Sequence, residues 1–189
     1  MEPEVESFSL PPDGNIPNNA LPLILYRHAL PPELRSPSGC QSLFARNTWG
    51  GNWVDGIFDY WHFHITGHEV LGCVAGHALV GFGGDGGITV EFRASDVVVI
   101  PAGVGHKRLG DKRDGFTVVG GYPPGQDGTI TRPGEVPLEE ARRAIAALPL
   151  PHADPVLTRD GPLMKAWGIA HAPLSAGSTN PGGPTNRAL

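Results

Sequence analysis

Two stretches of the chain decide its fold: residues 56–76 read GIFDYWHFHITGHEVLGCVAG, and residues 95–106 read SDVVVIPAGVGH. In the first stretch His62 and His64 are two residues apart, so on a β-strand their side chains leave the same face. Glu69 follows after a gap that is long enough for a tight turn, and it begins the next apolar run. A carboxylate can therefore return to the place where the two imidazoles point.

The second stretch brings a third imidazole. His106 follows the apolar run 97–100 and a turn that contains Pro101 and two glycines. Three imidazoles and one carboxylate from three strands would make a mononuclear metal site, because imidazole binds Fe, Mn, Ni, Cu and Zn and a carboxylate adds a hard oxygen ligand. Such a site would leave one or two positions for water, substrate or dioxygen. A single His-x-His pair is more often structural, so the hypothesis depends on the whole spacing.

Proline and glycine, 20 and 27 of the 189 residues, are distributed unevenly. Residues 1–39 hold eight prolines and residues 123–189 hold eleven, whereas residues 40–122 hold one proline and 17 glycines. Proline cannot donate to a sheet ladder, while glycine is tolerated at turns and bulges, so the centre indicates a β domain. We predict a Pro-rich N-terminal arm over 1–40, a β-barrel over 41–125, a C-terminal helix and covering segment over 126–172, and a disordered tail over 173–189.

Short apolar runs separated by Gly-rich turns predict strands over 53–60, 61–65, 69–74, 78–82, 88–93, 97–100 and 116–122. Many short strands without an intervening helical pattern are typical of an all-β sandwich or barrel. The run LPLILY at 21–26 predicts an edge strand or an arm packed on the barrel. One amphipathic helix is expected over 137–148, where it would cover an open face or edge of the barrel.

Charge and cysteine content exclude several classes. The net charge is −5, and no cluster of lysine and arginine is longer than a pair, so we expect no nucleic-acid partner. The first residues, MEPEVE, are acidic where a secretory signal would be basic, and no apolar run approaches the roughly 18 residues of a membrane helix. We therefore expect a cytoplasmic protein with no membrane partner. The two cysteines, Cys40 and Cys73, are expected to be reduced, with Cys73 as a packed thiol.

The spacing of the residues in the two stretches resembles the two sequence motifs of the cupin superfamily. The first motif is matched without a departure at Gly56, His62, His64, Glu69 and Gly76, and the second in its Pro-x-Gly-x-x-His part at 101–106. The resemblance implies an RmlC-like jelly-roll barrel, also called a double-stranded β-helix. It also implies one divalent transition metal (Fe, Mn, Ni, Cu or Zn) with His62, His64, Glu69 and His106 as its ligands.

The second motif has two departures: Ser95 replaces its leading glycine, and Gly110 stands where an asparagine is usual. Neither position is a ligand, so the departures put turn geometry in question rather than metal binding. The flanking segments resemble the bacterial YjlB-like cupins over residues 5–168, a branch that brings no assigned activity. Barrels of this kind often pair through edge strands and swapped arms, which predicts a homodimer that uses the arm at 21–26.

His68 leaves an alternative open for the fourth ligand. Strand alternation sends His68 to the face opposite Glu69, yet some cupins with His-Glu at this position use the histidine instead. The spacing to Gly76 favours Glu69, and His68 would then orient a ligand by a hydrogen bond or lie in a solvated turn. His77, just after the glycine, is expected to face solvent.

Other residues near the motifs have a functional and a structural interpretation. Four aromatic side chains could line a pocket or pack in the core: Trp53, Phe58, Tyr60 and Phe63. Of these Tyr60 shares the parity of His62 and His64 and is the best candidate to point inward. Four polar residues could contact an anionic substrate or form ordinary loop and rim contacts: Arg46, Asn47, Lys107 and Arg108.

A metal with an open position indicates two classes of function. The first is an enzyme of the oxygenase, isomerase or decarboxylase type, with a dioxygenase favoured, that acts on a small oxygen-rich molecule. The alternative is a non-catalytic module that binds a metal or a small molecule. The four ligand positions favour the enzyme but do not establish turnover.

Overall fold

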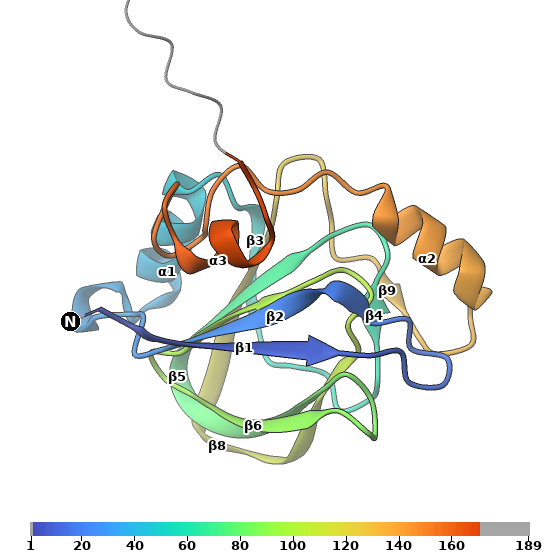
Figure 1. Ribbon diagram of the computed structural model, residues 1–189. Coiled ribbons are helices and arrows are strands. Elements are labelled where there is room, and N and C mark those ends of the chain that lie inside the picture. The colour runs from blue at the N-terminus through green and yellow to red at the C-terminus, as the bar shows by residue number, and fades with distance from the viewer. Residues whose placement is uncertain (1, 171–189) are drawn as a thin grey trace, which may run out of the picture.

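A curled antiparallel sheet forms the body of the protein in this computed structural model, which describes residues 2–170 (Figure 1). The strand order is β1-β2-β7-β5-β8-β3, with β6 pairing on β5, while β4 and β9 form a separate two-stranded ribbon. This arrangement confirms the all-β jelly-roll fold. The strands are β1 (Glu4–Leu10), β2 (Asn19–Arg27), β3 (Gly50–Asp55), β4 (Phe63–His64), β5 (Glu69–Phe82), β6 (Ile88–Arg93), β7 (Val97–Ile100), β8 (His106–Tyr122) and β9 (Ile130–Thr131).

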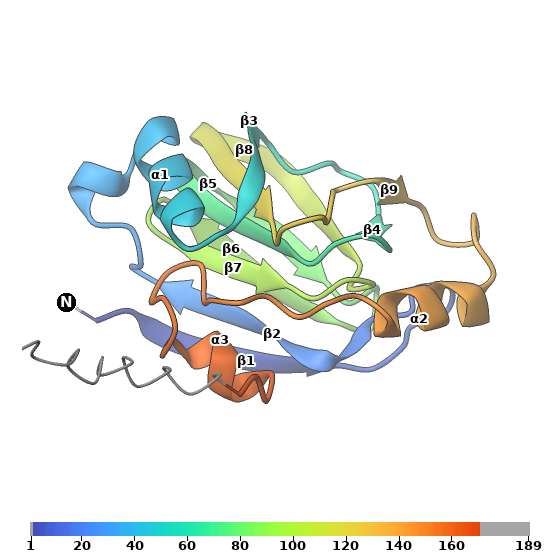
Figure 2. The ribbon, with the colours of Figure 1, turned by 90° about the horizontal axis from the view of Figure 1, so that it is seen from above.

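Three α-helices lie around the sheet within these residues: α1 (Pro37–Arg46), α2 (Leu138–Ala146) and α3 (Pro162–Ala166), with a short 3-10 turn at Pro32–Leu34. Figures 1 and 2 both place α1 and α3 toward one end of the sheet and α2 at the other end, beside β4 and β9. The sheet is therefore covered on part of its outer face, while α2 stands near the ribbon that carries His64.

Strand β2 is buried on both faces, which explains its unbroken apolar run. Leu23 and Leu25 pack into the barrel interior, whereas Ile24 and Tyr26 join a second core beneath α1 and α3. Strands buried on both faces lose the alternation of polar and apolar residues. The expectation of an edge strand or arm is wrong, because β2 lies between β1 and β7 and β1 forms the edge. The homodimer stays a prediction.

Strand β5 joins two segments that were expected to be separate strands. It continues through Gly76, whose φ is +65°, a conformation that favours glycine. A β-carbon there would also collide with the carbonyl oxygen of Arg113 on β8. The pairing with β8 shifts register between Cys73 and Leu79. The glycine therefore bends a continuous strand and does not end it.

The expected helix over 137–148 is present as α2, and it buries Ala141 and Ile145 against Ala102. Helix α1 was not predicted. Its start nevertheless has a clear local signal, because Ser36 accepts a hydrogen bond from the amide of Gly39 and Pro37 occupies the first turn. Helix α3 also begins with a proline and buries Leu163 and Met164.

The C-terminal segment is fixed to the sheet by indole and amide donors. Trp49 Nε1 donates to Ala153 O (2.9 Å) and Asn47 Nδ2 to Pro155 O (2.7 Å). Trp167 Nε1 donates to Pro22 O (2.9 Å). These bonds close the second core over β2. The tail expected over 173–189 lies outside the described residues.

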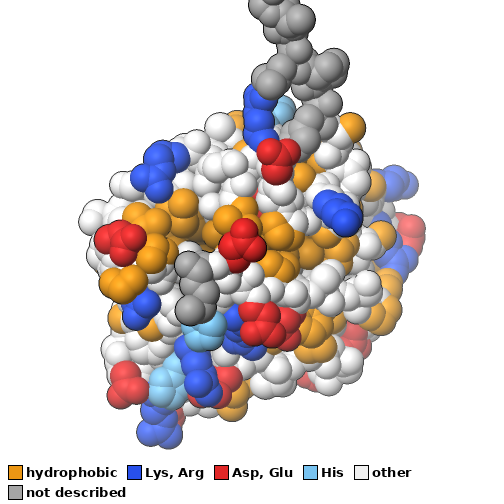
Figure 3. Space-filling model, turned by 60° about the vertical axis from the view of Figure 1, so that its left-hand side comes forward, with side chains coloured by type: hydrophobic (Ala, Val, Ile, Leu, Met, Phe, Trp, Pro, Cys, Tyr) orange, Lys and Arg blue, Asp and Glu red, His pale blue; other side chains and the backbone are white. Residues whose placement is uncertain are grey.

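Both cysteines are buried and free, and burial raises the pKa of each thiol to about 12. Figure 3 shows one face of the molecule, where hydrophobic side chains form an interrupted band and basic and acidic side chains are interspersed. Within residues 2–170, no helix combines the length and the apolar character that crossing a membrane requires.

Candidate metal centre

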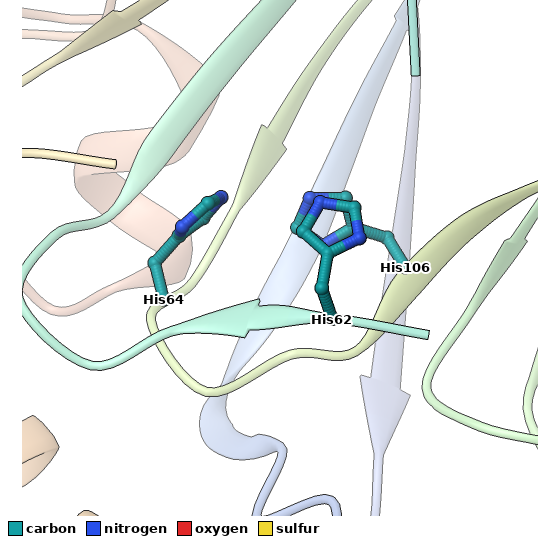
Figure 4. A group of neighbouring side chains, drawn as sticks. All are labelled: His62, His64 and His106. Atoms are coloured by element: carbon teal, nitrogen blue, oxygen red, sulfur yellow. The ribbon is translucent and has the colours of Figure 1, made fainter. Parts of the chain in front are cut away.

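Three buried histidines meet at one place. The ligating atoms of His62, His64 and His106 all lie within 4.8 Å of one another. Figure 4 shows the rings of His62 and His64 on one side of the β4 segment, with the His106 ring reaching the same space from the start of β8. The backbones of His62 and His106 are joined by hydrogen bonds in both directions (2.9 and 3.3 Å). The pairing of these two segments therefore brings the imidazoles together.

Each of the three rings has its Nδ1 engaged by a backbone carbonyl. The contacts are His62 to Tyr60 O (3.1 Å), His64 to Thr129 O (3.1 Å) and His106 to Val104 O (3.0 Å). A carbonyl oxygen can only accept, so each Nδ1 carries the hydrogen and each neutral ring keeps a lone pair on Nε2. This is the orientation that metal-ligating histidines usually have.

Glu69 lies against the histidine cluster and is 2% exposed. Its Oε2 is 3.1 Å from His64 Nε2 and 3.3 Å from His106 Nε2. Its Oε1 accepts a hydrogen bond from the hydroxyl of Tyr122 (3.0 Å). The structure thus brings together all four side chains that the motif spacing singled out.

Burial and mutual charge interactions shift the pKa values of the residues in the cluster. Burial would raise the pKa of Glu69, but His64 and His106 outweigh it and hold that pKa well below its usual range. Burial likewise would lower the pKa of His64, but the charge of Glu69 and their hydrogen bond raise it. Burial, followed by repulsion from His106, lowers the pKa of His62 to about 3. Glu69 and His64 thus shift each other's pKa in opposite directions, while His62 is neutral at pH 7.

The turn that carries His106 is braced by residues far away in the sequence. Asn18 Oδ1 accepts from the amide of Gly105 (3.2 Å), and Asn19 Nδ2 donates to Ala102 O (2.8 Å). Gly103 has a φ of +86°, and a β-carbon there would lie 2.6 Å from the Asn18 carbonyl oxygen. Sequence reasoning did not assign Asn18 and Asn19 to the site, because only the tertiary pairing brings them to this turn.

The two departures from the second motif leave its geometry intact. Ser95 takes a φ of +89°, so it keeps the left-handed conformation of the glycine that it replaces. Its backbone donates to Cys73 O (2.9 Å) and accepts from the amide of Leu30 (2.9 Å). Gly110 has a φ of +66° and open space around it. The turn before β7 is therefore formed with serine in place of glycine.

His68 points away from the cluster. Its Nδ1 accepts a hydrogen bond from the amide of Ala102 (2.9 Å), and its ring lies 4.9 Å from the ring of Trp167. Burial lowers its pKa to about 4, so the ring is neutral at pH 7. In this conformation His68 supports the turn before His106 by a hydrogen bond to its backbone, and Glu69 is the residue that faces the three histidines.

A cavity of about 300 Å³ opens beside the cluster and is lined by His62, His64, Glu69 and His106. Of the four aromatic candidates, Trp53 and Phe58 line it, while Phe63 is 1% exposed within the protein and does not. Tyr60 does not line it either, which corrects the expectation that it points inward. Strand β3 ends at Asp55, so parity counted back from His62 no longer applies at Tyr60.

The four polar candidates for anion binding lie outside the cavity lining. Asn47 is used in the bond to Pro155, and Arg46 ends α1. Lys107 Nζ lies 4.9 Å from the centre of the Trp61 ring, and Arg108 reaches toward Asp59 (3.6 Å). Three of the four, Asn47, Lys107 and Arg108, thus make contacts outside the cavity lining.

Tyr122 contacts the cluster, and sequence reasoning did not assign it to the site. Its hydroxyl donates to Glu69 Oε1 and accepts a hydrogen bond from Trp53 Nε1 (2.7 Å). Trp53 and Tyr122 together thus hold Oε1 of Glu69 in place and leave Oε2 facing the histidines. Tyr122 ends β8 some 53 positions after Glu69, so no local spacing announces the contact.

Replacing Tyr122 by phenylalanine should weaken metal binding about tenfold, because loss of a hydrogen bond that orients a ligand commonly has an effect of 10- to 100-fold. Competition of the protein with a chromophoric chelator for Zn²⁺ measures this affinity. The matched control is Tyr60→Phe, since Tyr60 stacks on Phe58 (5.1 Å) and makes no contact with Glu69. Equal affinities of Tyr122→Phe and the unaltered protein would rule out the positioning role.

Comparison with known proteins gives one strong match. The chain is 38% identical over 170 residues to the uncharacterized protein YjlB of Bacillus subtilis (strain 168), a match that spans 88% of this chain and 99% of YjlB. No protein-family model matches.

Solved structures give weaker matches. Acireductone dioxygenase from Bacillus anthracis, with a cadmium ion in its active centre, is 20% identical, with a TM-score of 0.39 over 55% of this chain and 77% of that one. RmlC from Streptococcus suis, in complex with dTDP-D-xylose, is 16% identical, with a TM-score of 0.32 over 63% and 70%. These structural similarities are too weak to support an activity.

The curled antiparallel sheet, with both sequence motifs folded against each other at its histidines, defines the chain as a cupin. Within the cupins it belongs to the family of YjlB, to which it is related over 88% of its length.

Proposed function

We propose that this protein binds one divalent transition metal through His62, His64, Glu69 and His106 and acts as an enzyme on a small oxygen-rich molecule. The proposal is supported by a single observation. Three Nε2 atoms and a carboxylate oxygen converge in a buried space, while every Nδ1 is committed to a carbonyl. Neutral imidazole nitrogens and a carboxylate oxygen are ligands that a divalent transition metal can bind at this place.

The donor set fits a first-row transition metal. Imidazole is a good ligand for Fe, Mn, Ni, Cu and Zn, and one carboxylate adds a hard oxygen. When bound, such a metal supplies a Lewis acid to substrate oxygen atoms and, if it is iron, redox chemistry as well. The chain's own contribution is to fix the three ring tautomers and to hold one carboxylate oxygen through Tyr122.

The place of the cavity supports the binding of a small molecule at the proposed metal position. Its lining includes all four proposed ligands, so a small molecule in it would lie against the metal position. We favour dioxygenase chemistry, with isomerase and decarboxylase chemistry as further forms of the same site. The apolar walls around the cavity would limit access of water to the reacting atoms.

Elemental analysis of the purified protein after expression in medium supplemented with these metals tests the proposal. We expect close to one equivalent of one transition metal, and then oxygen consumption with at least one member of a panel of catechols and diketones. Metal content near zero for all five elements would refute the metal site. Full metal content without turnover across the panel would instead identify a binding module.

A further inference from the structure

The cavity beside the three histidines is small, and most of its wall is apolar. At ~30 Å³ per water in the liquid, its volume of about 300 Å³ corresponds to on the order of ten non-hydrogen atoms. Six apolar side chains line it: Trp53, Val54, Ile57, Phe58, Leu71 and Ile130. The three rings of Figure 4 belong to the same lining, so these side chains would surround the body of a ligand that faces the histidines.

The charges in the lining are of one sign. Among the described residues that line the cavity, two are carboxylates, Asp55 and Glu69, and none is a lysine or an arginine. Glu69 already faces His64 and His106. A second negative charge on a ligand would therefore lose hydration with no lysine or arginine in the cavity lining to pair with, which is costly in an apolar environment. It would also be repelled by Asp55.

The cations near the cavity are engaged elsewhere. Lys107 lies over the Trp61 ring, Arg108 reaches toward Asp59, and Arg132 lies 3.9 Å from the centre of the Tyr60 ring. Lys112 is an exception, because its Nζ lies 3.2 Å from the place of a β-carbon on the lining residue Gly56. Lys112 is nevertheless absent from the cavity lining.

We propose that the ligand of this site is a small chelating molecule with an uncharged, apolar body. It carries at most one negative charge, and that charge lies on the oxygen atoms that face the histidines. This inference rests on the proposed function, because the chelating oxygen atoms need a metal. The inference narrows the class of oxygen-rich molecules that the site would bind. Dicarboxylates and phosphorylated compounds are disfavoured, and short aliphatic or aromatic chelators are favoured.

Two hydroxamic acids test the inference, because they share a metal-binding group and differ only in their tails. Butyrohydroxamic acid ends in a methyl group, and succinic monohydroxamic acid ends in a carboxylate at the same position. Both are titrated into the cobalt-loaded protein, and binding is followed by the change in its visible absorption. We expect butyrohydroxamic acid to bind at least tenfold more tightly.

An exposed lysine introduced at the cavity should weaken the preference for butyrohydroxamic acid. Val54 lines the cavity and is 44% exposed, so Val54→Lys places an ammonium group there without disturbing the core. This variant should bind succinic monohydroxamic acid about fivefold to tenfold more tightly and butyrohydroxamic acid within threefold of the unaltered protein. The matched control is Val5→Lys on β1, where the valine is 38% exposed and lies outside the cavity lining. It should change neither affinity.

The outcomes separate this inference from the proposed function. Equal or tighter binding of succinic monohydroxamic acid by a metal-loaded protein overturns the inference and leaves the metal site standing. Loss of that binding in Lys112→Gln would then identify the cation responsible. Failure to take up metal at all overturns both proposals.

Discussion

The His106→Ala variant is expected to lose at least 99% of its affinity for Zn²⁺, and to be purified with almost no transition metal. His106 is 1% exposed, its ring lies 4.2 Å from the ring of His62, and its Nε2 lies 3.3 Å from Glu69. Removing it deletes one of the four proposed ligands. Elemental analysis and chelator competition measure the effect.

Two other histidines provide the controls. His68→Ala removes a side chain that is as buried as His106 but bonds to the turn at Ala102, and His77→Ala removes a half-exposed ring near Asp114. Both variants should keep full metal content, although His68→Ala should lower the thermal stability. Circular dichroism shows whether each variant folds. Retention of metal by a folded His106→Ala protein would contradict the proposed ligand set. Loss of metal from a folded His68→Ala protein would indicate that His68 is a ligand.

The part of the site that could be predicted is the part that is encoded locally. His62, His64 and Glu69 lie within one strand–turn–strand unit, where the two-residue period of a strand fixes which side chains share a face. His106 follows a buried strand and a turn whose Gly103 must take a positive φ. Spacing alone therefore located all four side chains that the structure brings together.

The remainder of the site depends on contacts between distant segments. Tyr122 reaches Glu69 only because β8 pairs with β5, with Val70 opposite Gly121. Asn18 reaches the turn before His106 because the segment before β2 crosses it. The sequence around Tyr122 does not distinguish it from a tyrosine packed in the core. The sequence around Asn18 does not distinguish it from an ordinary loop asparagine. Their roles become visible only when the register of the strands is known.

The same reason explains the errors in the fold. The apolar run of β2 was interpreted as an edge, although a strand buried on both faces has the same pattern. The second face is covered by α1 and α3, and each of these helices buries too few residues to give a strong periodic signal. The number of layers over a strand cannot be derived from the strand's own sequence.

The second core that covers β2 depends on one buried carboxylate. Asp154 is 0% exposed, and its Oδ1 accepts from the amides of Val156 (2.8 Å) and Leu157 (2.9 Å). Its Oδ2 accepts from the amide of Leu163 (3.1 Å) and from the hydroxyl of Tyr26 on β2 (2.5 Å). Burial and the charge of Asp154 raise the pKa of Tyr26, so its hydroxyl stays a donor. The carboxylate thus joins the C-terminal segment, the start of α3 and the sheet.

Replacing Asp154 by alanine should lower the free energy of unfolding by about 3–5 kcal/mol, because it leaves two buried and two part-buried donors without this acceptor, and a buried donor without a partner costs ~1–3 kcal/mol. For a chain of this size that corresponds to a fall in melting temperature of roughly 6–20 °C.

Tyr26→Phe removes one of the four donors and should cost about 1 kcal/mol. Asp111→Ala, which removes an exposed carboxylate on β8, should cost about 0.5 kcal/mol or less. Chemical denaturation of the three metal-free variants gives these values. A loss for Asp154→Ala no larger than that for Tyr26→Phe would show that the backbone amides find other acceptors, and that the segment is held by Trp49, Asn47 and Trp167 alone.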